Sequence, residues 1–121
     1  MNISTMDTVD DLLPLPPAVF HILLVLAEGD NHGYAIIGAI AARTDGRVRI
    51  GAGTLYRSVQ RMLEDGLVAE IDERPAPEED DERRRYYRIT PLGRKAARAE
   101  ADRLSDLVKL ARSSGLAPRK A

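Results

Sequence analysis

The sequence predicts a mainly α-helical fold with a small β-hairpin, and three observations support this. Apolar residues recur at helical spacing in several segments that glycine and proline separate. Two short stretches that alternate apolar and polar residues flank a charged, proline-containing loop, which is the pattern of a hairpin. The 121 residues suffice for one domain with one core, and the absence of cysteine rules out a disulfide framework.

The N-terminal third of the chain predicts two helices. Residues 1–14 begin with a polar stretch and are expected to be flexible. Pro16 and Pro17 suit the first turn of a helix that ends before Gly29 and is apolar around most of its circumference, as expected of a central core helix. Asn31 is a good N-cap for a second helix.

Residues 51–68 predict a short amphipathic third helix between glycines. Its apolar residues fall at i, i+4, i+7 and i+8 and define the core face: Leu55, Val59, Met62 and Leu63. The opposite direction holds polar side chains, with two more at the flanks: Arg57, Gln60, Arg61 and Glu64, flanked by Thr54 and Tyr56. Burial of the first face leaves the basic face free to meet a polyanion.

The hairpin and a long last helix follow. The second strand places Tyr87 and Ile89 on one side, and its root carries three consecutive arginines, Arg83, Arg84 and Arg85. Thr90 and Pro91 form an N-cap and first-turn pair for a helix over residues 91–113. Residues 114–121 are expected to be a flexible tail.

The last helix carries the apolar seam of a coiled coil. Its members are spaced by four, three, four and three residues, with one leucine beside them: Ala97, Ala101, Leu104, Val108 and Ala111, with Leu107. So small a domain cannot cover the whole stripe of so long a helix. A second subunit is therefore expected to cover it, which predicts a homodimer.

This order of elements describes a winged helix-turn-helix domain over residues 15–90, followed by a dimerisation helix over residues 91–113. In such domains the third helix enters the DNA major groove and the hairpin lies along the backbone. Arginine can pair with guanine and glutamine with adenine, whereas hydroxyls and wing arginines suit phosphate oxygens. Two copies would bind a pseudo-palindromic operator of double-stranded DNA.

Three segments resemble the PadR-like family of transcriptional regulators: HGYAI (32–36), GTLYRSVQRMLEDGLV (53–68) and RRRYYRITPLGR (83–94). The resemblance implies a homodimeric repressor of the short subgroup, released by a small aromatic or phenolic effector. It implies that Tyr34 and Tyr56 lie near the DNA backbone and that Thr54 makes a contact from the third helix. It also implies that Gly33 and Gly53 let chain segments approach closely.

Other functions find little support. His21 and His32 have no metal-ligand spacing, and no catalytic signature is present, so neither an enzyme nor a cofactor is expected. Neither a signal peptide nor an apolar run of about 20 residues occurs, which predicts a cytoplasmic protein without a membrane partner. The alternative is a winged-helix module that binds another protein, favoured by the net charge of −1 and the acidic run at residues 78–82.

Overall fold

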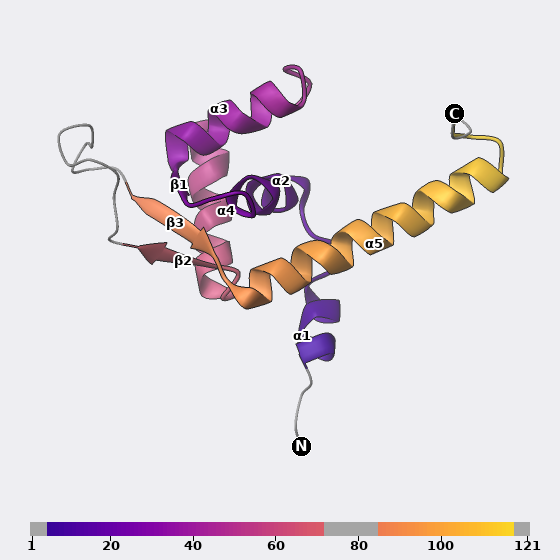
Figure 1. Ribbon diagram of the computed structural model, residues 1–121, viewed down its shortest axis with the longest axis horizontal. Helices are drawn as coiled ribbons and strands as arrows, with labels where there is room; N and C mark the ends of the chain where they lie inside the picture. Colours follow the sequence, from indigo (N-terminus) through magenta and orange to yellow (C-terminus); the bar gives the residue numbers. More distant parts are fainter. Residues whose placement is uncertain (1–4, 72–84, 118–121) are drawn as a thin grey trace.

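The computed structural model describes residues 5–71 and 85–117. Along these residues the chain forms α1 (Thr5–Leu12), α2 (Pro17–Leu26), β1 (Asn31–His32), α3 (Gly33–Arg43), α4 (Ala52–Glu64), β2 (Val68–Ile71), β3 (Tyr86–Ile89) and α5 (Pro91–Ser113). Helices α2, α3 and α4 pack together with the sheet beside them, and α5 extends outward from this body (Figure 1).

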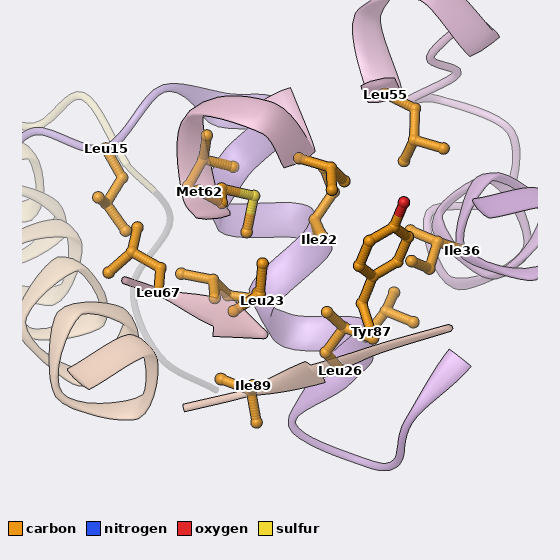
Figure 2. Close-up of a cluster of buried hydrophobic side chains, with 14 of the residues drawn as sticks. Leu15, Ile22, Leu23, Leu26, Ile36, Leu55, Met62, Leu67, Tyr87 and Ile89 are labelled. Atoms are coloured by element: carbon orange, nitrogen blue, oxygen red, sulfur yellow. The ribbon is translucent and has the colours of Figure 1, made fainter. Parts of the chain in front are cut away.

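Helix α2 is the centre of the core, as the sequence predicts. Three of its side chains, Ile22, Leu23 and Leu26, are at most 1% exposed, and α2 packs against α3, α4, α5 and β3. Figure 2 shows these side chains meeting leucine, isoleucine and methionine from the surrounding elements. Burying each such side chain stabilises the fold by about 1.5–3 kcal/mol, so this cluster fixes how the helices are arranged.

The predicted hairpin is confirmed, but it is part of a three-stranded antiparallel sheet in the order β1-β3-β2. Strand β1 pairs Asn31 with Tyr87 and His32 with Tyr86. The predicted N-cap of α3 was wrong. Asn31 Oδ1 instead accepts a hydrogen bond from the His32 N–H, and His32 caps the helix by accepting from the Ala35 N–H at 3.3 Å.

The N-terminal segment differs from the flexible region expected over residues 1–14. Residues 5–12 form helix α1, which packs against α5, and Val9 is only 3% exposed. The chain after α1 also contacts α5, because the Leu15 N–H donates to Oε1 of the buried Glu100 at 3.2 Å. Contact with α5 therefore orders a stretch whose own composition suggests a loose chain end.

The start of α5 is fixed against the turn between α4 and β2. Thr90 Oγ1 accepts from the Gly93 N–H at 3.0 Å and donates to the Gly66 carbonyl at 2.6 Å, which confirms the predicted cap. Gly93 is required there, since an added Cβ would lie 2.1 Å from the Leu67 carbonyl oxygen. These contacts hold the first turn of α5 against residues 66–67.

Beyond Arg103, most of α5 is exposed and leaves the body of the molecule (Figure 1). Over the residues that the structure describes, no helix is both long enough and apolar enough to span a bilayer.

Candidate nucleic-acid interface

Helix α4 has two contrasting faces. Its core face packs on the domain, because Leu55, Val59 and Met62 are at most 2% exposed and Leu63 is half-buried against them. The helix then stops where Gly66 adopts a φ of 77°, a conformation that favours glycine. The predicted core face is thus confirmed, and the side chains opposite it are directed away from the protein.

The outer face of α4 is polar and basic. Arg57, Gln60 and Arg61 are exposed, as is the acidic Glu64. Arg57 Nη2 donates to Thr54 Oγ1 at 3.4 Å, which holds the guanidinium over the first turn of the helix. Arg61 differs, since its Nε lies 3.4 Å from Asp65 Oδ2 one turn later. The Arg61 side chain is 74% exposed, and a surface ion pair of this kind contributes about 0–1 kcal/mol, so a phosphate or base can displace the carboxylate.

The first turns of α3 and α4 touch through a glycine. A Cβ on Gly33 would lie 2.8 Å from Leu55 Cδ2 and 3.0 Å from Tyr56 Oη, so a larger residue would have to displace these side chains. Tyr56 is nevertheless 49% exposed, and Tyr34, which follows Gly33, is 70% exposed. Two tyrosine side chains therefore reach solvent close to the start of α4.

The wing contributes Arg85, which is exposed just before β3 and whose Nη1 lies 3.9 Å from Glu70 Oε1 of β2. A hollow of about 330 Å³ separates it from α4 and is lined by Tyr56, Val59, Gln60, Leu63, Arg85 and Tyr87. Burial raises the pKa of the Tyr87 hydroxyl, and nearby Glu70 adds to this. The other two predicted wing residues, Arg83 and Arg84, lie outside the described residues.

A second exposed surface follows α5. Of the predicted seam, Ala97 and Ala111 are half-buried, whereas the other members are exposed: Ala101, Leu104, Leu107 and Val108. The sequence prediction missed Leu110 and Leu116, which are 63% and 82% exposed. The spacing from Leu107 to Leu110 is a helical i, i+3 pair and could have identified the first of them.

A further hollow, of about 620 Å³, lies between α1 and α5. Its apolar floor is formed by Val9, Leu13 and Ala99, and its rim is charged: Asp10, Lys95, Arg98, Asp102, Arg103 and Asp106. Within residues 5–71 and 85–117, no group of three histidine or acidic side chains could hold a metal ion. The hollow has the size of a small-molecule site.

The sequence was compared with protein families and with known proteins. The model of the transcriptional regulator PadR-like family matches residues 22–99. An uncharacterized protein X of Lysinibacillus sphaericus is 35% identical over 88 residues, which cover 73% of this chain and 72% of that protein. A 37.1 kDa uncharacterized protein in transposon TN4556 of Streptomyces fradiae is also 35% identical, but the chain spans only 22% of its length.

Solved structures have the same architecture. A transcriptional regulator from Clostridium thermocellum superposes with a TM-score of 0.69 at 28% identity, covering 93% of this chain and 97% of that one. A PadR family transcription regulator from Clostridium difficile superposes with a TM-score of 0.67 at 21% identity, covering 81% and 97%. The fold predicted from the order of elements is therefore confirmed.

Proposed function

Because the chain belongs to the PadR-like family of transcriptional regulators, we propose that it regulates transcription by binding DNA through the outer face of α4. The family consists of transcription regulators and not of enzymes. The observation that carries the proposal is the division of α4, whose core face is covered by its own chain while Arg57, Gln60 and Arg61 are exposed.

These side chains match the edges of base pairs in the major groove. Arginine donates two hydrogen bonds to O6 and N7 of guanine, and glutamine pairs with N6 and N7 of adenine. Arg57 is the better candidate for a base contact, because its bond to Thr54 holds the guanidinium near the start of the helix. Arg61, which is 74% exposed beside the half-buried Asp65, is then placed to meet a base or a phosphate further along the groove.

Phosphate contacts would come from the edges of this surface. The exposed tyrosines Tyr34 and Tyr56 carry hydroxyls suited to phosphate oxygens, and Arg85 at the wing adds a positive charge. We include Arg83 and Arg84 for their charge and position in the sequence alone. Contacts of this kind add affinity without choosing a sequence.

We further propose a homodimer formed through α5. The apolar side chains Leu104, Leu107 and Val108 remain 36%, 48% and 42% exposed, and pairing two such stripes would remove them from water. Two copies related by a twofold axis would present two α4 helices to a pseudo-palindromic operator, about one helical turn or a multiple of it apart. A dimer bound to its operator in the cytoplasm would act as a repressor of transcription.

An effector can then act by changing the separation of the two α4 helices. The hollow beside α5 has room for a small aromatic or phenolic molecule and an apolar floor to receive it. A coupling of about 1–3 kcal/mol between effector and DNA changes occupancy by about 5- to 150-fold. A ligand that shifts α1 against α5 therefore needs only a small difference in affinity between the two states.

A salt titration of binding to mixed-sequence duplex DNA tests the proposal. We expect the logarithm of the affinity to fall linearly with the logarithm of salt concentration, with a slope of about −0.9 for each phosphate contacted. An affinity that does not depend on salt, or no binding at low ionic strength, would overturn it. The winged helix would then be assigned to binding another protein.

A further inference from the structure

His32 caps helix α3 in a way that requires a neutral imidazole. The Ala35 N–H donates to Nδ1 of His32 at 3.3 Å, and the backbone of His32 has the extended conformation of an N-cap, with φ −105° and ψ 168°. Serine, threonine, aspartate and asparagine are the usual residues at this position. An imidazole nitrogen can accept this bond only while it carries no proton.

The ring of His32 is also held by the sheet. His32 pairs with Tyr86 of β3, and the two rings meet edge to face with centroids 5.3 Å apart. One residue therefore joins the wing sheet to the first turn of α3. The side chain is half-buried, so protons can still reach it from solvent.

This joint lies directly beneath the proposed DNA-binding surface. The next residue, Gly33, is buried against Leu55 and the Tyr56 hydroxyl, and the one after it, Tyr34, is 70% exposed. Because the cap bond spans residues 32–35, it fixes the backbone from which both Gly33 and Tyr34 start. A loosened cap would change how the two tyrosines are presented together.

We propose that His32 is a positioning residue whose neutral imidazole holds the first turn of α3, so that DNA binding weakens as the pH falls below neutrality. The inference rests on the proposed DNA binding. Protonation of Nδ1 acts in two ways, since it removes the hydrogen-bond acceptor and places a positive charge at the helix N-terminus, where the macrodipole disfavours it. Both effects destabilise the first turn.

Several titratable or charged side chains surround this joint. Among residues 5–71 and 85–117 they come from the loop before β1, from β3, from α3 and from α4: Asp30, Arg88, Tyr86, Tyr87, Tyr34 and Tyr56. Asp30 is bound by Arg88 through both carboxylate oxygens, at 2.8–3.2 Å, which keeps its charge compensated. Histidine is the residue type whose charge ordinarily changes between about pH 5 and 8.

The test compares the full-length protein with three variants on one mixed-sequence DNA duplex. His32→Asn supplies a cap that does not titrate, His32→Ala removes the cap, and His21→Asn replaces the other of the two histidines in the sequence. Between about pH 7.5 and pH 5.5, the wild type and His21→Asn should lose about fivefold in affinity relative to His32→Asn. His32→Ala should bind weakly at both pH values.

Parallel pH profiles for the wild type and His32→Asn would overturn the inference. The protonation state is also measured directly, by the ¹⁵N chemical shifts of the His32 ring with the Ala35 amide as reporter. We expect an unprotonated Nδ1 at neutral pH and a shift of the Ala35 amide on acidification; a proton on Nδ1 at neutral pH would refute the cap even if His32→Asn did not fold. This measurement needs no DNA, so it separates failure of the cap from failure of the proposed function.

Discussion

Helices α4 and α5 are both amphipathic, yet they leave opposite kinds of surface uncovered. Helix α4 buries Leu55, Val59 and Met62 within its own chain and exposes two arginines, a glutamine and a glutamate. Helix α5 buries Gly93, Ala96 and Glu100 near its start and exposes leucine and valine along its second half. Exposed arginines attract a polyanion, whereas an exposed apolar stripe is stabilised by a partner that removes it from water. The comparison supports the proposals that α4 meets DNA and that α5 meets a second copy of the chain.

The largest effect on stability is expected at the start of α5, where Gly93 contacts Leu67. Gly93→Ala places a methyl group about where the backbone oxygen of Leu67 lies, and a backbone atom cannot swing aside. We expect the free energy of unfolding to fall by about 3 kcal/mol, measured by urea denaturation.

Gly38→Ala is the matched control, because no atom lies within 4 Å of the added Cβ inside helix α3. It should raise stability by about 0.5–1 kcal/mol. Equal stability of the two variants would mean that α5 is not seated as described.

The exposed stripe of α5 is tested by Leu104→Glu. A buried, unpaired carboxylate opposes pairing of the stripes, so sedimentation should show monomers. DNA affinity should fall by about a hundredfold because two linked half-site contacts become one. Ser105→Glu adds the same charge on an exposed neighbouring position outside the stripe and should remain dimeric. A dimeric Leu104→Glu protein would place the interface elsewhere.

The basic face of α4 is tested by Arg57→Ala. We expect a loss of about 1–3 kcal/mol in binding to the preferred DNA sequence and a smaller loss on unrelated DNA, as measured by fluorescence anisotropy. Arg98→Ala removes an exposed arginine from α5 and should leave affinity unchanged. Equal losses on every sequence would reassign Arg57 to a phosphate contact.

The buried end of α5 is tested through Glu100, which is 3% exposed. Bonds from Arg103 at 2.7–2.8 Å, and more weakly from the Leu15 N–H, hold its pKa below the usual value of 4.5. Because the folded-state pKa is depressed, the stabilisation is present above the unfolded value and is lost as pH falls through the folded one.

Glu100→Gln should therefore cost about 1.5–3 kcal/mol at neutral pH and flatten the decline in stability below pH 4.5, as followed by thermal unfolding across pH. Asp102→Asn, an exposed carboxylate on the same helix, should leave both unchanged. A variant at Glu100 with the acid profile of the wild type would show that this carboxylate does not link the Leu15 segment to α5.

Much of this arrangement could be predicted from the sequence, because long periodic segments determine their own buried faces. The core face of α4 and the Thr90 cap follow from spacing and residue type alone, and the three sequence blocks identified the family that the matched model confirms. Helix α1 could not be predicted, since its order comes from contact with a helix about ninety residues away.

Strand β1 and the cap of α3 were missed for related reasons. Two residues are too few to show alternation, and Asn31 is a better cap by propensity than His32. In the structure, Asn31 and His32 pair with β3, and α3 begins directly after His32, which is therefore the N-cap. The predicted DNA-contacting and dimer residues stay predictions.

Selection of bound duplexes from a random DNA library by the full-length protein tests the central claim most directly. The account predicts enrichment of an inverted repeat, with half-sites about one helical turn or a multiple of it apart, and loss of one preferred base when Arg57 is replaced by alanine. A library that emerges without any enriched sequence, from a protein that also fails to bind DNA at low ionic strength, would contradict it.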